Sequence, residues 1–223
     1  MQKPFKYGLI GSSGRLGREV ITVFAEKNNE VVFEYNLEGE SLKDKPDVLI
    51  DCSLPEVINN TISYASKMSI PLVVATTGLS DDQIKNLKKL SEKIPVVQSY
   101  NYSVGVQILL RLTEFAHKEL DSWDVEIVEV HHRFKHDKPS GTAKMLKEIF
   151  KDQDVNISSL RLGNVPGDHI IRFGGLGEVI TISHSATSRR TFAEGILRSA
   201  EFIQSKKKGL FSFHDVIFSD KDQ

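Results

Sequence analysis

The stretch "KYGLIGSSGRLGREVITVFAEKN", from Lys6 to Asn28, decides the fold. Its opening run, KYGLIG, is apolar and has the length of a short buried strand. The residues after it, GRLGREVITVFAEKN, change to helical spacing, with apolar side chains on one face at Leu16, Val20, Val23 and Phe24. A strand, a glycine turn and a helix in this order are typical of the start of a parallel, doubly wound sheet.

The alternation of strands and helices continues to about Asn101. The pattern predicts strands at 30–36, 46–53, 71–78 and 95–101, with helices at 55–69 and 80–93 between them. Strands that alternate with helices at this spacing favour a parallel sheet covered on both faces. We therefore predict a Rossmann-type domain in the first part of the chain.

A different pattern follows and predicts a second domain. A helix at 107–119 leads into a strand at 124–132, and another helix begins at Ser140. Three extended segments, 158–163, 169–175 and 178–186, then follow without helices between them, which suits an open mixed or antiparallel sheet. An amphipathic helix at 189–207 follows this sheet, and 209–218 is expected to return to the first domain. The predicted class is α/β, with domains at 1–103 plus 189–223 and at 104–188.

Composition excludes several classes of protein. The chain has 223 residues, and 29 Lys and Arg against 30 Asp and Glu give a formal net charge of -1. No overall positive field would attract nucleic acid or anionic lipid, so neither partner is expected. The single cysteine, Cys52, cannot form an internal disulfide, and no apolar run approaches the ~20 residues of a membrane-spanning helix. A cytoplasmic protein is expected.

The glycine turn "GSSGRLG" predicts a nucleotide site. Gly11 and Gly14 lie between a strand and a helix, where backbone N–H groups bind a dinucleotide pyrophosphate and no side chain blocks its approach. The spacing departs from G-x-G-x-x-G, so a purely conformational turn is the alternative. Arg15 adds a cation for a phosphate, or else it is an ordinary solvated arginine.

The segment "EVHHRFKHDKPSGTAK", from Glu129 to Lys144, concentrates proton carriers and cations. It has three interpretations: a polar strand end without chemistry, a metal site, or proton transfer combined with anion binding. No cysteine or acidic cluster has the spacing of metal ligands, so no metal is predicted. The third interpretation explains more residues, because Ser140 is a good N-cap, and Gly141 and Thr142 would offer N–H groups and a hydroxyl to a carboxylate at the positive end of a helix.

This segment resembles the signature of the 4-hydroxy-tetrahydrodipicolinate reductase family, the nicotinamide-dependent reductases of the diaminopimelate route to lysine. The motifs "GSSGRLG", "ATTG", "QSYNYSVGV", "VPGDH" and "SRRTFA" resemble the same family and occur in its order. The resemblance implies that His131 is the general acid/base, that Lys135 donates a proton, and that His132, Gly141 and Thr142 bind substrate carboxylates. It also implies a dinucleotide-binding first domain, a substrate-binding second domain and a homotetramer built by the latter.

The resemblance further implies a set of cofactor-binding residues in the first domain and near its return. These are Gly11, Ser12, Ser13, Gly14, Arg15, Leu16, Asn36, Ala75, Thr76, Thr77, Ser99, Tyr100, Asn101, Tyr102, Arg189 and Phe192.

Three positions depart from the family pattern. Lys138 replaces a small residue, and Tyr102 replaces a common phenylalanine. Asn36 stands where an acidic residue normally ends the second strand and binds the adenosine ribose, and Glu34 or Glu38 is the alternative if the strand ends earlier or later. Because asparagine does not repel a 2'-phosphate, we expect both NADPH and NADH to be used.

The expected reaction is hydride transfer to a cyclic imine that carries two carboxylates. Such a site must bind two anionic groups and deliver one proton to the ring. Histidine suits the proton step because its ordinary pKa is about 6.5. Another two-domain Rossmann oxidoreductase acting on an amino acid or a sugar is the alternative within enzymes, and a nucleotide-sensing module without catalysis is the alternative outside them.

Overall fold

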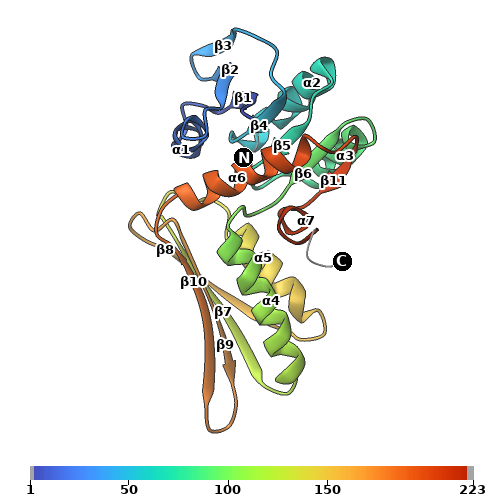
Figure 1. Cartoon of the computed structure of the whole chain (residues 1–223). Helices are drawn as coiled ribbons and strands as arrows, with labels where there is room; N and C mark the ends of the chain where they lie inside the picture. Colours follow the sequence, from blue (N-terminus) through green and yellow to red (C-terminus); the bar gives the residue numbers. More distant parts are fainter. Residues whose placement is uncertain (1–2, 220–223) are drawn as a thin grey trace. The chain divides into compact units, whose positions relative to one another are not determined.

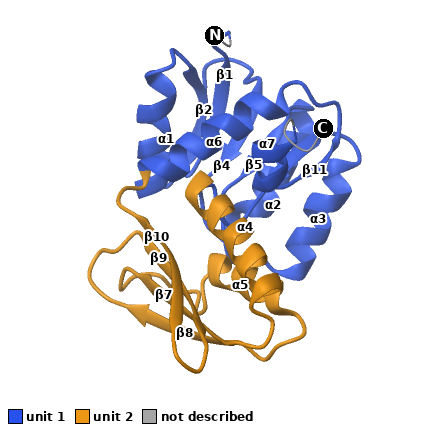
Figure 2. Cartoon of the chain, turned by 60° about the horizontal axis from the view of Figure 1, so that its bottom comes forward, with its two compact units in different colours: residues 1–102, 190–223 blue, residues 103–189 orange. Residues whose placement is uncertain are grey.

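The computed structural model describes residues 3–219 and divides the chain into two compact units. Unit 1 comprises the residues up to 102 together with those from 190 onward, and unit 2 comprises 103–189 (Figure 2). The predicted class, a Rossmann-like parallel sheet followed by a second mixed sheet, is confirmed. Among the described residues, no helix is both long and apolar enough to cross a membrane.

Unit 1 is built on a seven-stranded sheet in the order β11-β6-β5-β4-β1-β2-β3. Its strands are β1 (Lys6–Ile10), β2 (Glu30–Asn36), β3 (Gly39–Leu42), β4 (Val48–Asp51), β5 (Leu72–Val74), β6 (Pro95–Gln98) and β11 (Gly209–Phe211). All neighbours are parallel except β3, which pairs antiparallel with β2 at one edge. The short strand β3 was not predicted, because its residues "GESL" are all exposed and carry no apolar alternation.

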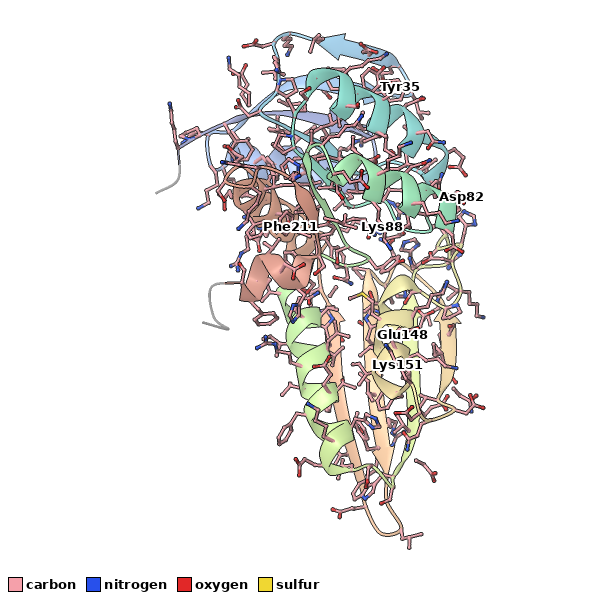
Figure 3. The ribbon with its side chains drawn as sticks, turned by 90° about the vertical axis from the view of Figure 1, so that its right-hand side faces the viewer. Tyr35, Asp82, Lys88, Glu148, Lys151 and Phe211 are labelled. Carbon is pink, nitrogen blue, oxygen red and sulfur yellow. The ribbon has the colours of Figure 1, made fainter. Side chains whose placement is uncertain are left out.

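Helices cover both faces of this sheet, as the alternating sequence predicted (Figure 1). They are α1 (Arg15–Ala25), η1 (Pro55–Val57), α2 (Ile58–Met68), α3 (Asp81–Ser91), α6 (Arg190–Ile203) and α7 (Phe213–Phe218). Helix α1 packs against α6, and α2 packs against α3. The chain returns to unit 1 through α6 and β11, where Phe211 (Figure 3) lies edge-on to Phe202 with 5.5 Å between ring centroids.

Unit 2 has a four-stranded mixed sheet in the order β10-β9-β7-β8. Its elements are α4 (Val104–Glu119), β7 (Asp124–His131), α5 (Gly141–Lys147), η2 (Glu148–Phe150), β8 (Asn156–Arg161), β9 (Gly167–Gly174) and β10 (Val179–Ala186). Strands β7 and β8 are parallel, and the two other pairs are antiparallel. Helices α4 and α5 lie on one face of the sheet (Figure 1). Helix α4 begins at Val104, earlier than predicted, because the Ser103 hydroxyl caps it by accepting a hydrogen bond from Val106 N.

The register of this sheet aligns like residues across its strands. Ile182, Ile171, Ile127 and Ile157 are cross-strand neighbours and form one continuous row. This isoleucine row belongs to the core under α4 and α5, together with buried aromatic side chains such as Phe150 and Phe173. Residues two positions apart on a strand point to the same face. The rows that follow on the same face, toward the end of β7, therefore also lie on the helix side.

Candidate active site

The glycine turn of unit 1 has the geometry that a dinucleotide requires. Gly11 has a φ of +84°, and a Cβ there would lie 2.6 Å from the backbone oxygen of Cys52. A Cβ at Gly17 would lie 2.2 Å from the Gly11 oxygen, so glycine is needed where α1 approaches the turn. Gly14 caps α1 without a side-chain hydrogen bond, and no acidic residue lies in the first turn. The positive end of α1 is therefore open to a phosphate, and the turn fits a pyrophosphate group.

The turn lies at the switch point of the sheet. Strand β1 has β2 on one side and β4 on the other, and the chain leaves β1 for β2 before it crosses to β4. In doubly wound sheets ligands bind outside the carboxyl ends of the strands at this point. Of the predicted cofactor residues on this turn, Ser12 is buried, whereas Ser13, Gly14 and Arg15 are exposed.

Asn36 is the last residue of β2, and its side chain lies beside the glycine turn. Its Nδ2 donates to Ser12 Oγ at 3.0 Å, and its Oδ1 accepts from Glu38 N at 2.8 Å. The hairpin from β2 to β3 fixes the amide, because Asn36 pairs with Gly39 across it. The end of the second strand is thus an asparagine already bonded to the turn.

Asp51 organises the neighbouring strand ends. Its buried carboxylate accepts hydrogen bonds from the hydroxyls of Ser53 (2.6 Å), Thr61 (2.6 Å) and Thr76 (2.7 Å) and from Ser53 N. The backbone oxygen of Asp51 accepts from Ala75 N at 2.8 Å. Asp51 thereby fixes two predicted cofactor residues, Thr76 through its carboxylate and Ala75 through its backbone oxygen. Thr77 is the next residue along the chain. Asp51 was not singled out in the sequence.

The loop after β6 contains further predicted cofactor residues. Ser99 is buried and donates to the Asn101 oxygen at 3.1 Å, whereas Tyr100 is exposed. Tyr102 has a different place: its hydroxyl donates to the Val74 oxygen at 2.7 Å, and its ring packs against Phe213. Burial raises the pKa of this phenol well above its ordinary value. The side chain of Tyr102 therefore belongs to the core of unit 1.

The motif "SRRTFA" spans the boundary between the units. Arg189 is the last residue of unit 2, and Phe192 lies half-buried in α6 of unit 1. It is Arg190 whose contacts explain the local structure. Its guanidinium donates to both carboxylate oxygens of Glu26 and to Glu194 Oε1, so it joins α6 to the end of α1.

Two polar rows follow the isoleucine row on the inner face of the unit 2 sheet, which is the face that α4 and α5 cover. The first consists of His184, His169, Glu129 and Ser159, which are cross-strand neighbours on all four strands. The second, at the end of β7, pairs His131 with Arg161. The polar rows bring together residues from separate motifs, "EVHH", "VPGDH" and "SSLRLG", which lie far apart in the sequence.

Glu129 is the centre of these rows. Its carboxylate is fully buried, and Arg161 donates to both oxygens, from Nη1 at 3.0 Å and from Nη2 at 2.8 Å. His131 Nδ1 and Ser140 N also bond to this carboxylate. Burial alone would raise the pKa of Glu129, but the hydrogen bonds from His131 and Arg161 outweigh it and hold that pKa well below its ordinary range. Glu129 is therefore an anion that orients His131.

Since Nδ1 of His131 faces Glu129, Nε2 is the nitrogen left for chemistry. A Cβ at Gly167 would lie 3.0 Å from His131 Nε2, so the glycine of "VPGDH" keeps the space beside this atom open. The ring of His131 is mostly buried. A histidine oriented by a carboxylate at one nitrogen can take up or release a proton at the other.

The loop between β7 and α5 carries the other predicted catalytic group. Lys135 Nζ forms an ion pair with Asp137 Oδ1 at 2.7 Å, and Arg161 donates to the backbone oxygens of Lys135 (3.3 Å) and Asp137 (2.6 Å). Arg161 thus fixes both Glu129 and this loop. His132 is half-buried directly after β7, and Lys138 is exposed. The structure places Lys135 on the same polar segment as His131, with its ammonium directed to Asp137.

The PSGT turn begins α5 as the sequence predicted. Ser140 is buried, and its hydroxyl caps the helix by accepting from Ala143 N at 3.2 Å. Thr142 is buried as well, and Gly141 is half-buried. Ser140, Gly141 and Thr142 are joined to Glu129 through the hydrogen bond from Ser140 N. The predicted acid/base and the predicted carboxylate site therefore share one buried anchor.

Within residues 3–219, no group of three or more His, Cys, Asp and Glu side chains is arranged to hold a metal ion. Sequence reasoning did not single out Glu129, Arg161 or His169. Glu129 carried a usable signal, because it lies two residues before His131 on a strand and therefore on the same face.

Comparison with known proteins covers nearly the whole chain. The family model described as the N-terminus of dihydrodipicolinate reductase matches residues 5–102, and the model of its C-terminus matches 105–217. A 4-hydroxy-tetrahydrodipicolinate reductase of Thermosipho africanus is 43% identical, over 95% of this chain and 97% of the relative. Another from Caldanaerobacter subterraneus is 35% identical, over 93% and 96%.

Solved structures show the same fold. The dipicolinate-bound dihydrodipicolinate reductase of a Paenisporosarcina species superimposes with a TM-score of 0.73 at 22% identity, over 94% of this chain and 98% of that one. A probable dehydrogenase of Thermotoga maritima gives a TM-score of 0.61 at 13% identity, over 95% and 92%. At these identities the likeness concerns the fold.

Proposed function

The chain belongs to the dihydrodipicolinate reductase family, and we propose which of its residues carry out the reaction. Its function is that of a nicotinamide-dependent 4-hydroxy-tetrahydrodipicolinate reductase in lysine and diaminopimelate biosynthesis. The observation that carries the assignment of residues is the buried anchor Glu129, which joins His131 to the PSGT turn. Turnover of NADH or NADPH that depends on 4-hydroxy-tetrahydrodipicolinate tests the function. Oxidation with an amino acid or a sugar instead would favour another Rossmann oxidoreductase.

Unit 1 binds the dinucleotide in this proposal. The turn from Gly11 to Leu16 holds the pyrophosphate through N–H groups at the start of α1, and Arg15 is the adjacent cation. Ala75, Thr76, Thr77, Ser99, Tyr100 and Asn101 line the neighbouring strand ends, and Arg189 and Phe192 complete the set. When bound, the reduced nicotinamide supplies the hydride. The chain's own contribution here is an open helix end and a set of loops fixed by Asp51.

Unit 2 binds the dicarboxylate and moves the proton. The Paenisporosarcina relative has dipicolinate bound, a planar ring with two carboxylates. We assign one carboxylate of this chain's substrate to Gly141 and Thr142 at the positive end of α5 and the other to His132. His131 acts as general acid/base through Nε2 because Glu129 occupies Nδ1. Lys135, an ammonium on the same segment, donates a proton and offsets the substrate's negative charge.

Asn36 supports the use of both cofactors. A carboxylate at the end of the second strand accepts hydrogen bonds from the ribose 2'-hydroxyl of NADH and repels the 2'-phosphate of NADPH. The amide of Asn36 carries no charge, and its contacts with Ser12 and Glu38 N hold it beside the turn. Arg15 is exposed at the start of α1, where it can meet a phosphate. We therefore propose dual use with a preference for NADPH.

Substitution of Asn36 by aspartate should shift the preference toward NADH. A charge-assisted contact with the 2'-phosphate contributes about 1.5–3 kcal/mol, or about tenfold to a hundredfold in affinity, and a hydrogen bond from the ribose hydroxyl of NADH to Asn36 offsets part of it. The wild type should therefore use the two cofactors with kcat/KM values within about tenfold to thirtyfold of each other, with NADPH favoured. Steady-state kinetics with both cofactors on wild type, Asn36→Asp and the control Glu38→Gln measures the ratio. A wild-type preference for NADH above about a hundredfold, about 2.7 kcal/mol, would contradict the proposal.

The outer face of the unit 2 sheet supports a homotetramer. The face opposite α4 and α5 carries the cross-strand pairs Val128 with Ile170 and Val130 with Leu160, and Leu160 is 48% exposed. Apolar sheet faces and open strand edges are normally covered. We propose that copies of this chain cover each other through this face.

Light scattering at micromolar protein should give about four times the chain mass of 25.0 kDa. Ile170→Asp places a charge in the centre of the outer face and should lower the mass, because burying an unpaired carboxylate at an interface is unfavourable. Lys118→Glu, a charge change on the exposed side of α4, is the control and should leave the mass unchanged. A monomeric wild type would end the assembly proposal.

A further inference from the structure

We infer that His169 is a positioning residue of this reaction, which holds the ring of His131 and the serine that begins α5 at a fixed spacing. The inference rests on the proposed roles of His131 and of the PSGT turn. His169 lies in β9, in the sequence "VPGDH", and it is 1% exposed. It contacts His131 and also Ser140, the residue that begins α5, and it is buried from solvent.

The first contact is with the acid/base. The rings of His131 and His169 meet edge to face, with 5.2 Å between centroids and 72° between planes. His131 has Glu129 at Nδ1 and the open position of Gly167 beside Nε2, so its ring can tilt unless another side chain packs against it. The ring of His169 provides that contact. Tilting would move Nε2, and misplacing a reacting atom by about 1 Å can cost about 10²-fold in rate.

The second contact is with the N-cap of α5. His169 Nε2 lies 3.5 Å from Ser140 Oγ. Since Ser140 Oγ accepts from Ala143 N, its own proton is available for His169 Nε2. Ser140 precedes Gly141 and Thr142, to which a substrate carboxylate is assigned. His169 therefore couples the direction of the first turn of α5 to the position of His131.

The surroundings of His169 keep it neutral. Burial lowers its pKa to about 3, and the nearby positive groups act in the same direction. The charged and titratable groups around this pair come from each neighbouring element: Glu129 on β7, Arg161 on β8, His184 on β10 and Lys135 on the loop before α5. A neutral ring supports His131 without repelling its protonated form. A lysine or arginine in this place would oppose protonation of His131.

Two substitutions separate the two contacts. His169→Phe keeps a ring against His131 and loses the contact with Ser140, so the dissociation constant of dipicolinate should rise about fivefold to tenfold, the scale of one neutral hydrogen bond. The pH midpoint of kcat should stay unchanged. His169→Asn keeps a polar group for Ser140 and loses the ring, so kcat should fall about tenfold or more and its pH midpoint should move, while dipicolinate binding changes less than about twofold.

The measurements use the full chain. Calorimetric titration with dipicolinate in the presence of NADH gives the dissociation constant, and kcat is followed from pH 5 to pH 9. Ser140→Ala should raise the dissociation constant at least as much as His169→Phe does, because it removes the contact with His169 and also the cap of α5. The double variant should raise it no further than Ser140→Ala alone, because the contact with His169 is already lost. The inference would be overturned if the increases in the dissociation constant of the two single variants multiplied in the double variant. It would also be overturned if both His169 variants had the wild-type kcat and dissociation constant.

Loss of folding would not hide the outcome. The single tryptophan, Trp123, packs against the core of unit 2, so its fluorescence reports whether each variant is folded. If the His169 variants fail to fold, the comparison of Ser140→Ala with wild type still decides: an unchanged dissociation constant rejects the coupling. Failure of the proposed function itself looks different, because His131→Asn would then retain turnover whatever the His169 variants do.

Discussion

Replacing His131 with asparagine should lower kcat by about 10²-fold to 10⁴-fold, the range for removing a positioned proton carrier. Asparagine is the informative choice because its amide nitrogen can still donate to Glu129, so the buried network keeps its partner while the titrating Nε2 is lost. The dissociation constant of NADH should not change, since the cofactor is assigned to unit 1. Steady-state kinetics and a fluorescence titration with NADH measure both quantities.

His136→Asn is the matched control for this prediction. His136 lies five residues after His131, on the loop that follows β7, it is exposed, and no role is assigned to it. Its substitution should leave kcat within about twofold, as expected of a surface position. Turnover near the wild-type value in His131→Asn, or an equal loss in both variants, would show that His131 does not carry the proton.

Substitution of Glu129 by alanine should reduce the free energy of unfolding of unit 2 by about 3–5 kcal/mol, because it leaves the Arg161 guanidinium without its buried partner. Urea unfolding followed by Trp123 fluorescence measures this loss within unit 2. Activity should fall as well, since His131 loses the group that orients it. Glu119→Ala is the control, because Glu119 is an exposed carboxylate of α4 in the same unit and contacts neither polar row.

The pH dependence of this loss has a definite sign. The folded pKa of Glu129 lies below its ordinary value of 4.5, so the carboxylate stabilises the fold above that pH, and the contribution is lost as pH falls below it. The difference between wild type and Glu129→Ala should therefore be full at neutral pH and shrink in acid. His169 acts in the same direction, because its folded pKa of about 3 lies below the ordinary 6.5 and acid favours the unfolded chain from pH 6.5 downward. A difference that grew in acid would contradict the assignment.

The sequence predicted most of unit 1 because its signals are local. The change from strand to helical spacing around Gly11 needs only neighbouring residues, and the glycine spacing fits the close approach seen at Gly17. Strand β3 was not predicted because it forms by pairing with β2 and all its residues are exposed. Propensity and periodicity carry no information about an exposed edge strand.

The site was predictable in part, and the reason is again distance along the chain. His131 and Thr142 belong to one segment, and the resemblance assigned them directly, whereas Ser140 of the same segment was predicted only as the N-cap of a helix. Arg161 and His169 reach them only through the register of four strands, which no pattern within a single segment contains. Asp51 is similar, because its partners Thr61 and Thr76 come from a helix and from the next strand end.

The isoleucine row lies next to the polar rows on the same face of the sheet, so we expect that stability and ligand binding can be changed independently. Ile127, Ile157, Ile171 and Ile182 share strands with the chemistry but lie at another level, so exchanges among apolar side chains there alter cohesion of the sheet. The histidines and the arginine of the polar rows are attached to the same strands at the neighbouring levels. Under the proposed assignment, substitutions in the isoleucine row should change stability and substitutions in the polar rows should change ligand binding, although both sets of residues lie on the same strands.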